Sequence, residues 1–417
     1  IILTGTHYDI QETLIIPMDN LTLKSNNTNP EDCIIDGNNS VRILDIHQVS
    51  GFALENICIQ NGYHDDDSED YAAGISYYHS WNNVINNCLI ENCITPSGLS
   101  FGVGGIKCET SSLTISNLEA NNNEGSGYGF FKFISQESGY QDDLIITNSI
   151  IANNNGNRVG GIYGYQTYGA VANLTLDNCL FVNNIATTVS GSTGAIRWSD
   201  GYHQGGNSSV SISNTTISDN EGYTTGGIYV DNTNINLKTL NSIIWENVPS
   251  QLDCSGQVEV TYSNIEDGFT GTGNIDENPQ FEDPGNVTLY QETHGYGLTD
   301  ASPCVDTGDP SYPADPDETT IDMGCFYFEH FYDIHRLSKG YNWESFSRIG
   351  TEPNGNVPTN IIPILYNIDP FGDITSIIFD AYEGDDLTWD LTFFWSDDPY
   401  FTQSSWLYKI EILPGEE

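Results

Sequence analysis

The stretch that decides the fold is Leu174-Thr175-Leu176-Asp177-Asn178-Cys179-Leu180-Phe181-Val182-Asn183-Asn184. Apolar and polar residues alternate up to Asn178 and alternate again after it, which predicts strands with one buried face. Asn tolerates the left-handed backbone conformation that a sharp bend needs, so we interpret Asn178 and Asn183 as corners. The stretch therefore predicts two short strands that meet at a bend.

The same pattern recurs along the chain, and the intervals between its first corners are 31, 30, 31, 30, 36, 27 and 23 residues. Each copy also has a third short strand that begins at Gly and carries an inward-facing apolar residue. A period of this length predicts a solenoid. The first corners are Asn56, Asn87, Asn117, Asn148, Asn178 and Asn214, with looser copies at Asn241 and Asn264, and the inward residues are Ile75, Ile106, Ile162, Ile196 and Ile228.

Three strands per repeat describe a triangular coil, and stacked coils place each strand parallel to its copy at about 4.8 Å. Equivalent Asn residues then form a ladder along each corner. We therefore predict an all-β fold, a right-handed parallel β-helix, with the handedness taken from the general rule for parallel crossovers.

Three regions follow from where the repeat holds and where it ends. We assign residues 1–277 to the β-helix and residues 278–330 to a capping segment, because a solenoid needs an atypical end unit. Alternating apolar residues in 374–379 and 387–395 indicate that 331–417 is a separate small antiparallel β module, similar to a β-sandwich.

Composition excludes several partners. The chain has 11 Lys and Arg against 58 Asp and Glu, a formal net charge of −47, which disfavours nucleic acid and anionic lipid. No apolar run of 18 residues occurs, so we expect no insertion into a membrane.

The residues after the repeat carry a family resemblance. They include Asn278-Pro279-Gln280-Phe281, then Ser302-Pro303-Cys304-Val305-Asp306-Thr307-Gly308-Asp309-Pro310 and Asp322-Met323-Gly324-Cys325-Phe326. With the repeat, this pattern resembles the terminal motif of secreted bacterial right-handed parallel β-helix repeat proteins, which are extracellular or surface-anchored. The resemblance implies an extracellular or cell-surface location. In that setting, the loop of about 20 residues between Cys304 and Cys325 predicts a disulfide.

One outward-facing row concentrates basic and aromatic residues. The residue after each inward apolar position faces outward and is Lys107, Lys132, Tyr163, Arg197 or Tyr229. Like charges on adjacent coils are easier to understand if an anionic ligand lies across them, and tyrosine rings offer flat faces for sugars. We predict that the row binds an acidic glycan. Two alternatives stay open, a solvated face with no ligand and the catalytic face of a lyase with a Lys, Arg or Tyr base.

Other candidate sites are fewer. The loop around Asp65, Asp66 and Asp67 is dense enough in carboxylates to bind calcium, or it is simply a solvated loop. No other cofactor is expected, and no His lies at metal-ligand spacing, so we do not expect zinc. A glycoside hydrolase needs paired carboxylates. The polygalacturonase motifs of other β-helices are absent here, so we interpret Asp142-Asp143 as turn residues and assign no catalytic residue.

These observations favour a secreted or cell-surface structural or adhesive protein. We expect it to bind extracellular polysaccharide or other surface proteins without catalysis. One alternative is a polysaccharide lyase or glycoside hydrolase that acts on an acidic glycan. Another is a self-assembling extracellular fibre subunit, since the unpaired strands at the ends of a solenoid favour end-to-end association.

Overall fold

The computed structural model describes residues 1–66, 71–98, 101–201, 206–285 and 295–329, and the backbone of two strands within 376–394. The chain divides into two compact units, Ile1–Phe328 and Glu329–Glu417. Within the described ranges, no helix is both long enough and apolar enough to cross a membrane.

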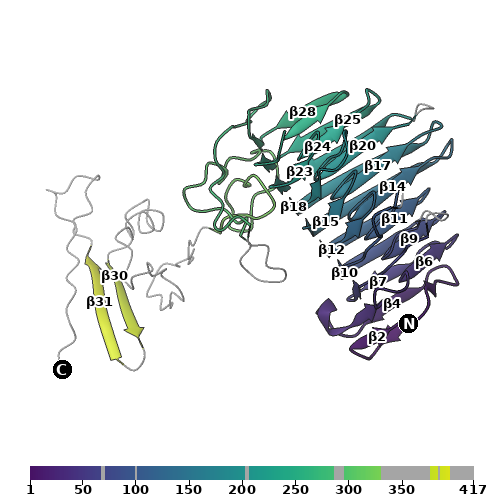
Figure 1. The fold of residues 1–417 in the computed structure, drawn as a ribbon. Coiled ribbons are helices and arrows are strands. Elements are labelled where there is room, and N and C mark those ends of the chain that lie inside the picture. Colours follow the sequence, from purple (N-terminus) through teal and green to yellow (C-terminus); the bar gives the residue numbers. More distant parts are fainter. Residues whose placement is uncertain are drawn as a thin grey trace. The chain divides into compact units, whose positions relative to one another are not determined.

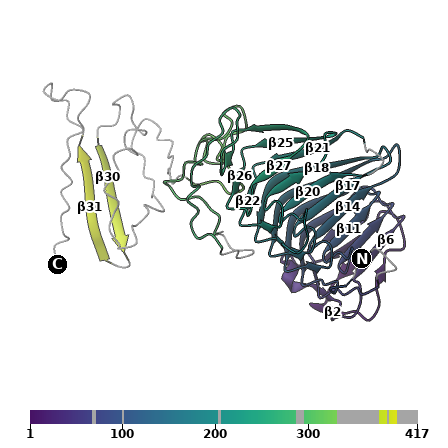
Figure 2. The ribbon, with the colours of Figure 1, turned by 45° about the horizontal axis from the view of Figure 1, so that its top comes forward.

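The first unit is the parallel β-helix that the repeat predicts, with strands stacked coil upon coil (Figures 1 and 2). Its largest sheet has 16 strands, and the longest of them bend at an Asn and so contribute to two faces of the coil. The main path of this sheet is β1 (Ile2–Leu3), β4 (Thr22–Ser25), β7 (Ala53–Glu55), β10 (Asn83–Glu91), β12 (Leu113–Asn121), β15 (Gln141–Ala152), β18 (Val171–Val182), β21 (Ser208–Ser213), β25 (Ile235–Leu240) and β28 (Gln257–Thr261).

Shorter strands extend this sheet beyond the bend. In the first and last coils the strand is interrupted at the corner, and the residues after the corner form a separate short strand. These strands are β2 (His7–Asp9), β5 (Ile34–Asp36), β8 (Cys58–Gln60), β22 (Thr216–Ser218), β26 (Ile243–Trp245) and β29 (Asn264–Ile265).

The third face of the coil is a nine-stranded parallel sheet, which we call sheet B. It is built from the Gly-initiated strands of the repeat and carries the outward row predicted above. Its strands are β3 (Leu14–Ile15), β6 (Leu44–His47), β9 (Ile75–Tyr78), β11 (Ile106–Glu109), β14 (Phe131–Ser135), β17 (Ile162–Gln166), β20 (Ile196–Asp200), β24 (Ile228–Val230) and β27 (Leu252–Cys254).

The remaining elements of this unit are short. A four-stranded sheet fills one corner, and a single 3-10 turn, η1 (Pro30–Asp32), follows Asn29, whose side chain accepts a hydrogen bond from the N–H of Glu31. The corner strands are β13 (Glu124–Gly125), β16 (Asn155–Gly156), β19 (Ile185–Ala186) and β23 (Glu221–Gly222).

The predicted corners and core register are confirmed. All six first-corner Asn residues have φ between 46° and 57°, which is the left-handed conformation that the bend requires. Asn87 donates to Asn56 over 2.8 Å, and Asn178 donates to Asn148 over 2.8 Å. Inside sheet B one unbroken row runs Ile75, Ile106, Phe131, Ile162, Ile196 and Ile228, and every member is fully buried.

The described residues of the next segment, 278–285 and 295–329, pack along the side of the coils. Tyr296 donates to Asp219 over 2.7 Å, and the N–H of Cys325 donates to Thr216 over 3.1 Å. The N–H of Asp309 donates to the side-chain oxygen of Asn241 over 2.7 Å. The segment therefore covers the outer face of β22 and its neighbours with irregular backbone.

In the second unit the structure describes one antiparallel pair, β30 (Ser376–Glu383) and β31 (Asp386–Phe394). The pair falls where the alternation of apolar residues indicates antiparallel strands. Three of the four Trp residues in 331–417 lie outside the described residues.

Candidate functional site

The five predicted ligand-binding residues form one row across sheet B. Strand pairing places Lys107 beside Lys132, Lys132 beside Tyr163, Tyr163 beside Arg197, and Arg197 beside Tyr229. The row continues to Ser76 and Asp45 at one end and to Asp253 at the other. The repeat therefore brings these side chains together on adjacent coils.

Lys107 does not point into solvent, contrary to our expectation. Its exposed fraction is 5%, and its Nζ lies 2.6 Å from Oε2 of Glu109, two residues along the same strand. Glu109 also accepts a hydrogen bond from Gln136. The ammonium group is thus neutralised within the protein.

Lys132 is also buried, with an exposed fraction of 5%. Its Nζ lies 5.5 Å from the ring centre of Phe101 and 5.2 Å from that of Tyr128, close enough for cation–π attraction. Both rings come from the loops that precede the sheet B strands. These loops fold over the row, which is why an outward position on a strand is not an exposed one here.

The far end of the row is paired in the same way. Arg197 contacts Asp231 over 2.9 Å, donates to Ser199 over 3.1 Å, and lies 5.1 Å from the ring centre of Tyr229. Tyr163 stacks on Tyr128 with ring centres 4.6 Å apart. Burial raises the pKa of Tyr163 to about 12 despite the opposing effect of Arg197. Lys107 and Arg197 therefore have acidic partners within the protein, so their place on the row does not by itself require an anionic ligand.

A different surface carries accessible rings. Five aromatic side chains at the C-terminal ends of sheet B strands and in the turns that follow contact one another in sequence, and we call them the aromatic ledge: His47, Tyr78, His79, Trp81 and Tyr140. The successive ring-centre distances are 4.8, 4.2, 6.1 and 5.5 Å. His47 and Tyr140 are exposed and the other three are partly exposed. The ledge spans several coils, so it is elongated along the solenoid.

A buried carboxylate fixes the centre of the ledge. The indole Nε1 of Trp81 donates to Oδ1 of Asp142 over 3.1 Å, although the two residues lie two coils apart. Ser135 donates to the other oxygen of Asp142 over 2.6 Å. Asp142 is fully buried, and burial raises its pKa against the effect of these two hydrogen bonds. Asp142 therefore positions the indole ring and is inaccessible to a polysaccharide.

The ledge has an acidic surrounding. Nε2 of His79 lies 3.1 Å from Oε1 of Glu137, and Trp81 stacks on Tyr140 with an angle of 12° between the rings. The repeat pattern does not predict the ledge, because its members come from strand ends and from the turns after them. The available signal was the cluster Tyr77-Tyr78-His79-Ser80-Trp81 at one turn.

The predicted calcium loop is only partly described. Asp65 and Asp66 are exposed, and Asp67 lies outside the described residues. A separate group of side chains with potential metal-ligand atoms does come together, since single such atoms of His7, Asp9 and Asp36 all lie within 4.8 Å of one another. We did not expect it, because Asp36 belongs to the next coil and is distant in sequence.

The predicted disulfide is wrong. Cys304 and Cys325 are both buried free thiols. Cys304 packs in an apolar cluster with Ile243 and Met323, whereas Cys325 packs in another with Leu180 and Tyr296. The two thiols are therefore committed to different clusters.

Comparisons with known proteins give the chain no family. No protein-family model matches it, and no curated protein matches it. Among solved structures it is similar to a chain described as the crystal structure of pectate lyase Pel9A, with a TM-score of 0.48 and 14% sequence identity. That similarity covers 79% of this chain and 87% of the other.

Proposed function

We propose that the protein binds an extracellular glycan without catalysis, at the cell surface or in the surrounding matrix, and that the aromatic ledge is the binding surface. The observation that carries the proposal is the continuous contact of five partly exposed or exposed rings along the solenoid. Aromatic rings present large, flat apolar faces with few rotatable bonds, which suits the apolar faces of sugar rings.

The ledge is also preorganised. The hydrogen bond from Trp81 to buried Asp142 and the stacking of Tyr140 on Trp81 hold two rings nearly parallel before any ligand arrives. A surface that is already ordered loses less side-chain entropy on binding. This supports a role in recognition.

Charge favours a neutral glycan over the acidic one that we expected from the sequence. The chain has a net charge of −47, and the carboxylate of Glu137 lies beside the ledge, 3.1 Å from Nε2 of His79. Lys107 and Arg197, which would attract an acidic chain, are paired with Glu109 and Asp231. A polyanion would therefore meet repulsion at the ledge and no unsatisfied cation on the neighbouring row.

The same geometry gives little support to the alternative that the protein is a lyase. A catalytic base must reach the sugar and must give up its proton near the working pH. Lys107 and Lys132 are buried, and Tyr163, with a pKa of about 12, keeps its proton at neutral pH. This is why we propose binding and not cleavage.

The test is affinity electrophoresis of the full chain through gels that contain neutral or acidic polysaccharides. We expect retardation by at least one neutral glucan, galactan or mannan. Tyr140→Ala should weaken it at least about fivefold, since an exposed ring that contacts the ligand contributes about 1 kcal/mol or more. Tyr223→Ala is the matched control, because Tyr223 is 59% exposed and lies outside the ledge. Equal retardation of both variants, or retardation only by acidic glycans, would contradict the proposal.

A further inference from the structure

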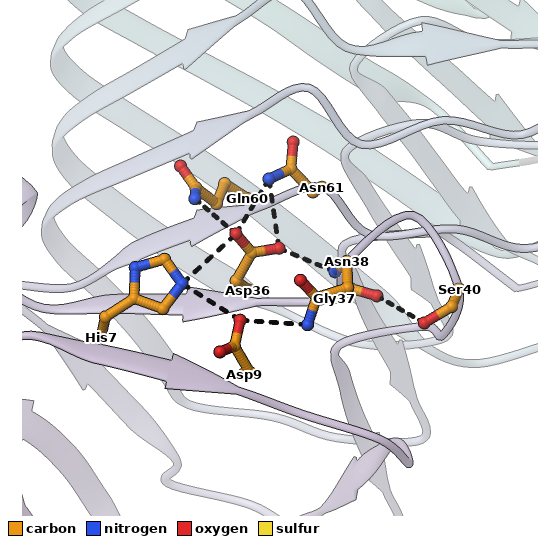
Figure 3. A network of polar contacts seen from close by, with 8 residues as sticks. All are labelled: His7, Asp9, Asp36, Gly37, Asn38, Ser40, Gln60 and Asn61. Atoms are coloured by element: carbon orange, nitrogen blue, oxygen red, sulfur yellow. Dashed lines mark hydrogen bonds and ion pairs between the residues drawn. The ribbon is translucent and has the colours of Figure 1, made fainter.

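A group of polar side chains lies at the start of the solenoid, on β2 and β5 of the largest sheet (Figure 3). His7 and Asp9 are two residues apart on β2, so their side chains leave the same face of the strand. Strand β2 pairs with β5 in a register that places Asp9 beside Asp36. The fold thus brings one imidazole and two carboxylates to one point from two coils.

Two distances within this group are close to those between ligands of one metal ion, and all three ligand atoms lie within 4.8 Å of one another. Nε2 of His7 lies 3.3 Å from Oδ1 of Asp9 and 3.5 Å from Oδ2 of Asp36. Both are longer than an ordinary N–H···O hydrogen bond of about 2.7–3.2 Å. With metal–ligand bonds of about 2.0–2.1 Å, the edge of a tetrahedron is about 3.3–3.4 Å. The imidazole nitrogen is therefore spaced from both oxygens as two ligands of one ion would be.

The carboxylate of Asp36 is held in place by its surroundings. The N–H of Asn38 donates to it over 2.7 Å, Gln60 donates over 2.7 Å, and Asn61 donates to its two oxygens over 3.1 and 3.0 Å. Outer partners of this kind orient metal ligands and keep them ionised.

The other two ligands leave the site open. The side chains of His7 and Asp9 are 43% and 62% exposed, whereas Asp36 is buried. Asn38 donates to Oδ1 of Asp9 over 3.1 Å and so links the two carboxylates. An ion bound here would contact the buried, hydrogen-bonded carboxylate of Asp36 on one side and would be accessible to water on the other.

We propose that His7, Asp9 and Asp36 bind one divalent transition-metal ion of the Zn²⁺ type, with the remaining position taken by water. The nitrogen ligand favours Zn²⁺, Co²⁺ or Ni²⁺ over Ca²⁺ and Mg²⁺, which prefer all-oxygen sites. Coordination to Oδ2 of Asp36 replaces one half of the bifurcated hydrogen bond from Asn61. The alternative is that His7 only forms ion pairs with Asp9 and Asp36, and that the three residues have no affinity for metal.

The test is titration of the full chain with Co²⁺ and Zn²⁺ in excess Mg²⁺, which occupies weak sites on so acidic a protein. We expect one saturable site, followed by the visible absorption of four-coordinate Co²⁺ and by calorimetry with Zn²⁺. His7→Gln and Asp9→Asn alter exposed side chains, so both should fold, and each should weaken binding by more than about tenfold. Glu12→Gln, which changes an exposed Glu elsewhere, should bind as the parent does.

Proton competition gives a second readout. Metal binding requires deprotonated ligands, so affinity should fall on acidification, and binding should release protons. Absence of a saturable site in the parent, or equal affinity in His7→Gln and the parent, would overturn the proposal and leave the imidazolium pair.

Discussion

Nδ2 of Asn154 donates to Oδ1 of Asn184, one coil further on, over 3.0 Å, and both side chains are fully buried. The same bond links successive coils into a buried ladder of Asn123, Asn154, Asn184, Asn220 and Asn247. Each amide also donates to a backbone carbonyl of another coil, as Asn154 does to Ala120 over 3.1 Å. The ladder therefore satisfies buried backbone groups where strands end at the second corner.

Removal of one rung should be costly. Asn154→Ala leaves the backbone N–H and the side-chain amide of Asn123 without their acceptor, and the carbonyl of Ala120 without its donor. We expect a loss of at least about 2 kcal/mol in the free energy of unfolding, measured by urea denaturation. Asn236→Ala, on the outer side of β25, should stay within about 0.5 kcal/mol of the parent. A loss in Asn154→Ala no larger than this would show that the ladder is dispensable.

The pairing of the basic row predicts a stability effect. Lys107→Gln removes the partner of a poorly exposed carboxylate, since the side chains of Lys107 and Glu109 are 7% and 13% exposed. We expect a loss of about 3 kcal/mol. Lys238→Gln breaks a matched pair with Glu259 in which both side chains are more than 60% exposed, and it should cost less than about 1 kcal/mol. Equal thermal melting of the two variants would argue that Lys107 is solvated.

Glu119 predicts a pH dependence of stability. Burial, with the neighbouring carboxylates of Glu91 and Glu31, raises its pKa to about 8, and its Oε1 is buried without a hydrogen-bond partner. An unfolded glutamate has a pKa of about 4.3. Between these values the folded chain holds a proton that the unfolded chain has lost, so the contribution of Glu119 to stability falls as pH rises from about 4 to 8.

Glu119→Gln should remove that dependence. The variant should match the parent at pH 4 and exceed it at pH 9 by on the order of 1 kcal/mol or more in the free energy of unfolding. Glu124→Gln, at an exposed Glu of the same coil, should change neither value. If the difference in the free energy of unfolding between the parent and Glu119→Gln is the same at pH 9 as at pH 4, the expected pKa of Glu119 is contradicted.

The cysteines predict a chemical result. All nine are free thiols, eight of them buried, and burial raises the pKa of Cys304 and Cys325 to about 12 each. Low thiolate content and burial both slow oxidation. Thiol titration in denaturant without reductant should therefore find nine thiols per chain. A count of seven would show that one disulfide is present.

Much of the fold was predictable because the repeat imposes one local geometry on every coil. Asn at a bend and alternation on either side fixed the register so well that Ile162 and Ile196 pair as the sequence predicts. The outward row was equally predictable as a row. Both follow from the period of two in a strand and from parallel stacking.

The burial of Lys107 and Lys132 on that row was not predictable, because it depends on loops of irregular sequence. The ring of Phe101 contacts Lys132 from a loop, and the conformation of that loop does not follow from the repeat period. Trp81 reaches Asp142 across a whole coil, and His7 meets Asp36 from another coil, so neither contact has a fixed sequence spacing. Contacts between side chains that extend along the solenoid axis cannot be predicted from the position of each residue within its own coil.

The most direct measurement of glycan binding at the ledge is hydroxyl-radical footprinting of the full chain with and without the neutral polysaccharide that retards it most. We expect oxidation of Trp81 and Tyr140 to fall on binding, while Tyr223 and Tyr327, which are 59% and 44% exposed, stay unchanged as internal controls. Unchanged oxidation of Trp81 and Tyr140 in the bound state, with protection elsewhere on the solenoid, would contradict the aromatic ledge as the binding surface.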